Sequence, residues 1–159
     1  FGGIDIRVLA YRLNGWTSEE FETGAPWKIE GDTYLNPGLG LAWRKPAGFS
    51  FSGTDLVWPD PTVAALDGPD GARVVFQEKT RPPWKEFSAA AEEVFSGHKV
   101  SGPARTIKLG MLPGLRKDGS EEAVAVCDYS PDVWIITARG KNASGILTEA
   151  LRGFRPAGR

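Results

Sequence analysis

The segment covering residues 34–51 constrains the fold most, because it contains a short β-strand together with the turns that bound it. Apolar residues alternate with smaller or polar ones over residues 39–44, the period of a strand with one buried face. Pro37-Gly38 precedes this run and Pro46 follows it, and both are typical turn residues. None of these side chains is a nucleophile, a base or a metal ligand, so the segment predicts a fold and not a reaction.

Several other segments are rich in β-branched and apolar residues, which are typical of strands. We predict a first strand at residues 4–10 ending at the Asn14-Gly15 turn, and two strands joined by a tight turn at residues 68–71. Further strands are predicted at residues 99–109, 123–127 and 133–138, with a loop through Pro113, Gly114 and Gly119. The last two strands are expected to be central in the sheet.

Apolar residues at three- and four-residue steps predict two helices. The first is expected to begin at Pro82-Pro83, to bury an aromatic stripe that includes Trp84, and to end at Gly97. The second is expected to be capped by Ser144 and to lie on the sheet through residues 146–154. Together these elements predict an α+β fold, an antiparallel β-sheet flanked by helices.

Composition limits the domain organisation and the classes of partner. The 159 residues are 41% hydrophobic, which suits one principal domain. Because residues 17–28 are polar, we divide the chain into an N-terminal strand, hairpin and linker (residues 1–32) and an α+β domain (residues 33–159). The net charge of −1 argues against nucleic acid as a partner, and no apolar run is long enough to span a membrane. Because the chain begins at Phe1, we interpret it as a processed product or a part of a longer protein.

Three short motifs, Tyr34-Leu-Asn-Pro, Leu39-Gly-Leu and Pro46-Ala-Gly-Phe49, together with the order of elements over residues 33–156, resemble the PsbP-like domains of bacteria and chloroplasts. A similar layout, closed by a Phe-Arg element like Phe154-Arg155, occurs in the C-terminal domain of BepA-like periplasmic zinc metallopeptidases. The resemblance implies an antiparallel sheet with helices against it, a periplasmic or extracellular location, and a non-catalytic role in assembly or substrate handling.

The inventory of reactive side chains agrees with a non-catalytic role. A zinc peptidase motif needs two histidines, whereas the chain has only His98, and no glycine-rich phosphate-binding motif is present. A Cys127–His98 nucleophile and base is possible by residue type, but Cys127 is expected to be a core residue. The aspartate pairs Asp128/Asp132 and Asp67/Asp70 are calcium candidates that we interpret as turn formers. We therefore predict no enzyme activity, no catalytic residue, no metal and no cofactor.

Six tryptophans are the unusual feature of the composition. Three of them, Trp43, Trp84 and Trp134, fall on the apolar phases of their elements and are expected in the core. Trp27 and Trp58 follow or precede prolines in loops and are our candidate residues for contact with a ligand or partner.

Two hypotheses about function follow. We favour a protein-binding accessory domain of a bacterial cell-envelope protein, whose partner is another protein or a partner domain such as the catalytic part of a metallopeptidase. The alternative is a small-molecule or carbohydrate-binding module that uses the two loop tryptophans.

Overall fold

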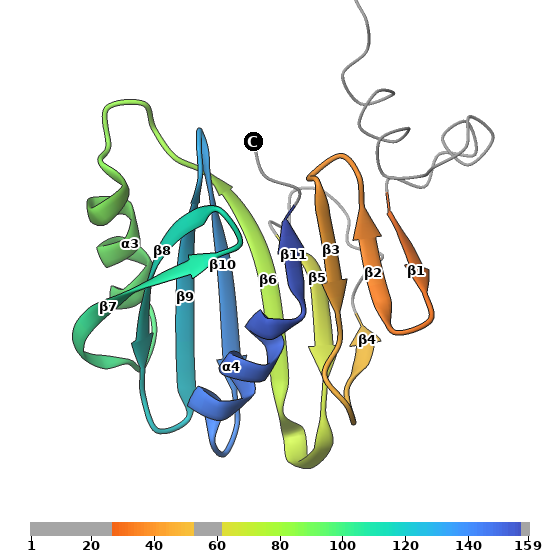
Figure 1. Cartoon of the computed structure of the whole chain (residues 1–159). Helices are drawn as coiled ribbons and strands as arrows, with labels where there is room; N and C mark the ends of the chain where they lie inside the picture. Colours follow the sequence, from red (N-terminus) through yellow and green to blue (C-terminus); the bar gives the residue numbers. More distant parts are fainter. Residues whose placement is uncertain (1–26, 53–61, 157–159) are drawn as a thin grey trace, which may run out of the picture.

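Residues 27–52 and 62–156 are described by a computed structural model and form two antiparallel β-sheets and two α-helices (Figure 1). In these residues the larger sheet has the order β4-β5-β6-β10-β9-β8-β7. Its strands are β4 (Ser50–Ser52), β5 (Thr62–Asp67), β6 (Arg73–Thr80), β7 (Ser101–Leu109), β8 (Leu112–Asp118), β9 (Glu122–Tyr129) and β10 (Asp132–Arg139). The smaller sheet has the order β1-β2-β3-β11, with β1 (Lys28–Glu30), β2 (Thr33–Asn36), β3 (Leu41–Arg44) and β11 (Phe154–Pro156).

The two helices lie on opposite faces of the larger sheet. Helix α4 (Ala143–Arg152) and the smaller sheet cover one face, where Leu147 and Trp43 belong to the same buried cluster as Trp134 of β10. Helix α3 (Phe87–Ser96) covers the other face, where Phe95 is buried with Ile135. Figure 1 shows α4 and the smaller sheet in front of the larger sheet. The predicted α+β fold, with helices against antiparallel strands, is therefore confirmed.

Burial on both faces explains why β9 and β10 read as continuous apolar runs. In β9, Ala125 and Cys127 face the cluster under α4, whereas Val124 and Val126 face α3. Residues two apart point to the same face of a strand, so consecutive residues of β9 enter different cores. Strand β10 lies between β6 and β9 in the middle of the sheet, as predicted.

The core between the two sheets is built around aromatic rings. Trp43 is completely buried, and its ring centroid lies 4.6 Å from that of Phe154 and 6.2 Å from that of Phe76. Its indole N–H donates a hydrogen bond of 3.1 Å to the carbonyl oxygen of Ala150 in α4. The predicted core positions of Trp43 and Trp134 are confirmed, since both are 0% exposed.

The segment with the PsbP-like motifs contains two strands and not one. β2 and β3 pair through a turn in which Gly40 N–H donates to the Pro37 carbonyl at 3.0 Å, so Leu39 lies in this turn rather than in the strand. The strand begins at Leu41 because only from there do its residues pair with β2 and β11.

The loop predicted through Pro113 and Gly114 is wrong, because these residues lie in β8. Pro113 stands near the start of the strand, one residue before the pairing with β9 begins at Gly114, where a missing N–H is tolerated. Gly114 is required by packing: a Cβ atom there would lie 2.8 Å from the Val126 carbonyl oxygen and 3.0 Å from Cys127 Sγ. Turn-forming residue types therefore masked a strand.

The predicted cap of the last helix is also wrong by two residues. Asn142, with φ 58°, is the N-cap of α4, and its side-chain oxygen accepts a hydrogen bond of 3.3 Å from Gly145 N–H. Ser144 instead lies in the first turn, and its hydroxyl donates to Asp118. The predicted packing of this helix on the sheet is confirmed by buried Leu147 and Ala150.

The hairpin of β1 and β2 crosses the division that we predicted at residue 32. Ile29 pairs with Tyr34, and Asp32 in the turn accepts a hydrogen bond of 3.0 Å from Arg44. The predicted strand at residues 4–10 lies outside the described residues, so the separate N-terminal unit stays a prediction. Within the part of the chain that the structure describes, no helix is long and apolar enough to cross a membrane.

Candidate functional site

Trp84 is the large apolar side chain that the structure leaves most open to solvent, with 84% of its surface exposed. The prediction that it lies in the core is wrong. Helix α3 begins at Phe87, three residues after Trp84, so the helical spacing that relates these two residues in the sequence does not apply. Instead, Trp84 lies in the connection between β6 and α3, which we call the Trp84 loop (residues 81–86).

The Trp84 loop is held in place by hydrogen bonds on both sides of the ring. Lys85 N–H donates to the Pro82 carbonyl at 3.0 Å, which closes a turn around Trp84. Arg81 donates from Nη1 to the Lys85 carbonyl at 2.8 Å and forms an ion pair of 3.4 Å with Asp128 at the end of β9. Two prolines further restrict the backbone of this loop. The exposed ring is therefore presented on a constrained support.

A hollow of about 250 Å³ lies behind this loop, between it, α3 and β10. Lys79, Arg81 and Lys85 contribute basic groups to its lining, and Val94 and Val133 contribute apolar surface. Lys85 is paired with Glu93 at 2.7 Å. In Figure 1 the loop lies at the same end of the larger sheet as the turn between β9 and β10. This end of the sheet combines an exposed aromatic ring with a basic, partly apolar hollow.

Of the two tryptophans predicted as contact residues, the structure describes only Trp27. Trp27 is half-buried directly before β1, and its ring is stacked on that of Tyr34 with centroids 5.9 Å apart and planes at 28°. Trp58 lies outside the described residues. Both stay predictions as contact residues, and a ring already stacked on Tyr34 has at most one face left for a ligand.

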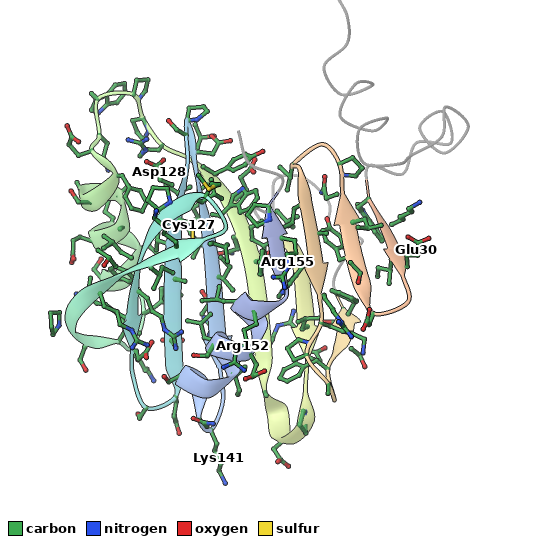
Figure 2. The ribbon with its side chains drawn as sticks, viewed as in Figure 1. Glu30, Cys127, Asp128, Lys141, Arg152 and Arg155 are labelled. Carbon is green, nitrogen blue, oxygen red and sulfur yellow. The ribbon has the colours of Figure 1, made fainter. Side chains whose placement is uncertain are left out.

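Cys127 and His98 do not form a catalytic pair. Cys127 is completely buried on the face of β9 that faces α4, and burial raises its pKa to about 12. His98 lies just beyond α3, with its Nδ1 3.8 Å from Glu122 at the other end of β9. Cys127 lies five residue steps along the extended strand from Glu122, a distance of about 16 Å. Figure 2 shows Cys127 beside Asp128 at the far end of that strand.

One aspartate of each pair considered as calcium ligands forms an ion pair with an arginine. Asp67 forms an ion pair of 2.6 Å with Arg73, and Asp128 is paired with Arg81. Over residues 27–52 and 62–156 there is no group of three or more His, Cys, Asp or Glu side chains that could hold a metal ion.

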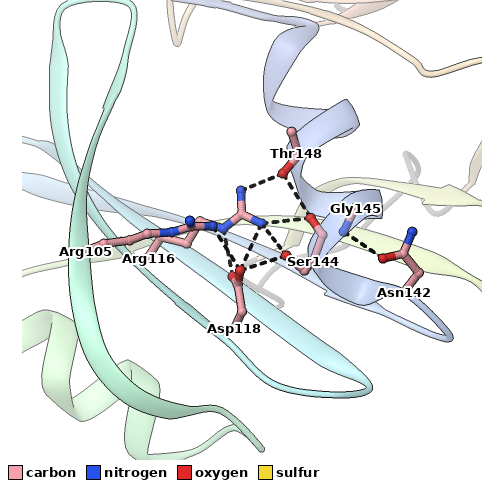
Figure 3. A network of polar contacts seen from close by, with 7 residues as sticks. All are labelled: Arg105, Arg116, Asp118, Asn142, Ser144, Gly145 and Thr148. Atoms are coloured by element: carbon pink, nitrogen blue, oxygen red, sulfur yellow. Dashed lines mark hydrogen bonds and ion pairs between the residues drawn. The ribbon is translucent and has the colours of Figure 1, made fainter.

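A polar network under α4 was missed by sequence reasoning (Figure 3). Arg116 of β8 is 4% exposed and donates from Nε to Asp118 at 2.8 Å, and from its two amino groups to Thr148 Oγ1 at 3.0 Å and the Ser144 carbonyl at 2.7 Å. Arg105 forms a second ion pair with Asp118 at 3.0 Å. Burial acts to raise the pKa of Asp118, but the hydrogen bonds from Arg116 and Ser144 outweigh it and hold that pKa below its usual value. The network fastens α4 to the sheet.

His98 is expected to make the folding stability depend on pH. Its Nδ1 is buried without a hydrogen-bond partner among the described residues. Burial lowers the pKa of His98 below 6.5, and the charges of Arg139 and Lys79 lower it further against the opposing charge of Glu122. Below about pH 6.5 the unfolded chain therefore binds the proton more readily than the folded chain, so folding stability falls as pH falls through this range.

We expect the free energy of unfolding of the native protein, measured with urea at pH 7.5 and at about pH 5, to decrease between these values. His98→Gln is expected to lose less stability over the same interval, because glutamine has no proton to gain. The carboxyl groups with shifted pKa values are Asp32, Asp67, Asp118 and Glu122, and their pKa values are lowered from 3.8 or 4.5. These groups therefore titrate below the interval between about pH 5 and pH 7.5. An equal decrease in both proteins would show that His98 is not the group responsible.

No protein-family model matches the chain, and no curated protein sequence matches it. Among solved structures, the chain is similar to the solution structure of cyanobacterial PsbP (CyanoP) from Synechocystis sp. PCC 6803, with a TM-score of 0.55 and 8% sequence identity over 81% of this chain and 97% of that one. It is also similar to a crystal structure from Bacteroides thetaiotaomicron VPI-5482, with a TM-score of 0.50 and 8% identity over 80% of this chain. That second match covers 49% of the longer Bacteroides chain. At such low identity the similarity establishes architecture alone: the chain has a PsbP-like fold.

Proposed function

We propose that this chain is a non-catalytic accessory domain that binds a protein partner through the Trp84 loop. The observation that carries the proposal is the 84% exposure of Trp84 on a loop fixed by Arg81 and by the turn from Pro82 to Lys85. Tryptophan is enriched among the residues that dominate binding energy at protein interfaces. A constrained loop backbone also loses little conformational freedom when it binds, so more of the contact energy is retained as affinity.

The basic residues near the ring indicate a partner with apolar and acidic groups close together. Lys79, Arg81 and Lys85 lie around the hollow behind the loop, which includes the apolar side chains of Val94 and Val133. Because Arg81 and Lys85 already have acidic partners, the excess of positive charge there is modest. Apolar contact with Trp84 is therefore the main source of the affinity that we expect.

The cellular setting belongs to the same proposal. The PsbP-like resemblance supports a bacterial cell-envelope protein, in the periplasm or outside the cell, whose partner is another protein or the catalytic part of a metallopeptidase. The Bacteroides structure supports a role within a longer chain, since a unit of this shape makes up about half of it. Cell fractionation of the natural host tests the location: recovery in the cytoplasmic fraction would contradict it.

The small-molecule or carbohydrate-binding alternative has less support. It depends on Trp27 and Trp58, and Trp27 is already stacked on Tyr34. Acrylamide quenching of tryptophan fluorescence in the native protein, Trp27→Phe and Trp58→Phe, with and without candidate glycans, tests it. Protection of either ring by one glycan would favour this alternative over a protein partner.

The binding experiment places a photo-crosslinking residue, p-benzoyl-phenylalanine, at exposed Glu86 beside Trp84 and forms adducts in the natural host. We expect one discrete protein adduct, whose yield falls about tenfold or more when Trp84→Ala is added, since an interface tryptophan contributes about 2 kcal/mol or more. The control carries the same probe at exposed Lys141, at the opposite end of the sheet in Figure 2. The absence of an adduct, or an adduct that is equal from both positions or insensitive to Trp84→Ala, would overturn the proposal.

A further inference from the structure

A second hollow, of about 410 Å³, lies on the outer face of the smaller sheet where α4 ends. Four of the side chains that line it are basic, Arg44, Lys45, Arg152 and Arg155, and only Glu149 is acidic. We call this hollow the basic hollow. It lies on a different surface from the Trp84 loop, because α3 covers the opposite face of the larger sheet.

The alternation of the small strands produces the basic hollow. Leu41 and Trp43 of β3 point into the core, so Ala42 and Arg44 lie on the outer face. Ala42 is directly opposite Arg155 in the register of β3 and β11. A short alanine side chain between two arginines leaves a depression with a basic rim.

Close backbone packing forms the other side of the basic hollow. Arg44 N–H donates to the Gly153 carbonyl at 2.9 Å, which joins β3 to the end of α4. A Cβ atom at Gly153 would collide with the Arg44 carbonyl group, so glycine is needed for this approach. The absence of a side chain at this position keeps that side open between Arg44 and Arg152.

The charges in the basic hollow are only partly compensated. Arg152 is paired with Glu149 at 2.6 Å, and Arg44 with Asp32 at 3.0 Å. Lys45 and Arg155 form no ion pair with any carboxylate in the described ranges. Counting all four basic groups against Asp32 and Glu149 leaves two positive charges in excess on a protein whose net charge is −1. This local sign is opposite to that of the whole chain.

Arg155 is oriented by the backbone and retains free donors. Its Nη1 donates to the carbonyl oxygens of Arg152 at 2.6 Å and Phe154 at 3.0 Å, an arrangement that also suits the negative end of the α4 dipole. Its Nε and Nη2 make no hydrogen bond within the described residues. An arginine fixed in this way offers a planar pair of donors that matches two oxygens of a carboxylate or phosphate.

We propose that the basic hollow is an anion-binding site for a carboxylate or phosphate group, with Arg155 and Lys45 as its principal ligands. Arg155 supplies two parallel N–H donors, and Lys45 supplies a point charge from the residue after β3. Two sources carry this chemistry: a free small anion, and an acidic side chain or C-terminal carboxylate of a peptide.

Isothermal titration calorimetry at low ionic strength tests the site with three probes: inorganic phosphate, tricarballylate and a hexapeptide of glutamate. We expect at least one probe to bind at millimolar concentration or tighter, and the double variant Lys45→Gln/Arg155→Gln to weaken it about tenfold or more. The matched control is Lys108→Gln/Lys141→Gln, which removes the same charge at exposed positions elsewhere and should change affinity less than about twofold. Phosphate binding without peptide binding identifies a free anion, and the reverse identifies a peptide.

Two outcomes would overturn the inference: no binding of any probe, or equal weakening by both double variants, which indicates only the general charge of the protein. Arg155 also donates a hydrogen bond to the Arg152 carbonyl at the end of α4, so the stability of each variant is measured by unfolding in urea. The single variant Lys45→Glu provides a second test in which this hydrogen bond is intact. Lys45→Glu is expected to weaken anion binding by more than Lys108→Glu. The result is independent of crosslinking at the Trp84 loop, so either proposal can fail without the other.

Discussion

Trp43→Ala is expected to lower the free energy of unfolding by about 3–5 kcal/mol, the usual cost of truncating a fully buried large aromatic side chain. The ring is 0% exposed and contacts Phe51, Phe76 and Phe154, so its removal leaves a cavity between the two sheets. It also leaves the Ala150 carbonyl without the indole N–H. Equilibrium unfolding in urea, followed by far-UV circular dichroism, measures the effect.

Trp84→Ala is the matched control, because it is the same substitution at a ring that is 84% exposed. We expect it to change the free energy of unfolding by less than about 0.5 kcal/mol. If Trp43→Ala is too unstable to fold, Trp43→Phe keeps most of the apolar contact and loses the hydrogen bond, with an expected cost of about 1–2 kcal/mol. Similar stabilities of the two alanine variants would contradict the position of Trp43 between the sheets.

The contrast between these two tryptophans shows what sequence patterns predict well and what they do not. Trp43 belongs to a strand in which apolar residues alternate with smaller or polar ones, so its burial follows from this period of two. Trp84 fits a period of 3.6 with Phe87, but this period says nothing about the residue at which the helix begins. The turn between Pro82 and Lys85 delays the start of α3, and the ring remains in solvent.

The strands with both faces buried were predicted well for a related reason. β9 and β10 read as β-rich apolar runs of strand length with a turn between them. β8 was missed because Pro113 and Gly114 are read locally as turn residues. Gly114 is needed by the approach of β9, a contact between residues distant in the sequence that a local pattern does not contain.

The candidate sites depend even more on distant contacts. Arg44 and Arg155 reach the basic hollow from strands more than a hundred residues apart in the sequence. The Phe154-Arg155 element is visible in the sequence as part of the PsbP-like resemblance, but its pairing with β3 is not. The exposure of Trp84 depends on the residue at which α3 begins, and the sequence pattern does not determine that residue. Sequence reasoning therefore predicted the architecture and little of the surface.

The burial of Arg116 was also not predicted from the sequence. Replacing this residue is expected to have the second large effect on stability. A single arginine in a segment of glycine and proline has no sequence signal for burial, yet it is 4% exposed beneath α4. We expect Arg116→Met to lower the free energy of unfolding by about 3 kcal/mol, because it removes the buried cation that pairs with Asp118 and donates to Ser144 and Thr148 of α4. Asp118 would keep its ion pair with exposed Arg105 and the hydrogen bond from the Ser144 hydroxyl, and the Ser144 carbonyl would lose its charged donor.

Two further variants separate the buried pair from the surface pair on the same carboxylate. The side chain of Arg105 is 62% exposed. Arg105→Met removes this exposed partner of Asp118 and is expected to lower the free energy of unfolding by less than about 1 kcal/mol. The double variant Arg116→Met/Asp118→Leu removes the buried Arg116 charge together with its partly buried partner and is expected to recover part of the loss, since an apolar pair leaves no unpaired charge. With the single variant Asp118→Leu added, urea unfolding of the native protein, Arg116→Met, Asp118→Leu and the double variant forms a double-mutant cycle for Arg116 and Asp118. A cost for Arg116→Met no greater than that for Arg105→Met would mean that the network under α4 does not hold the helix to the sheet.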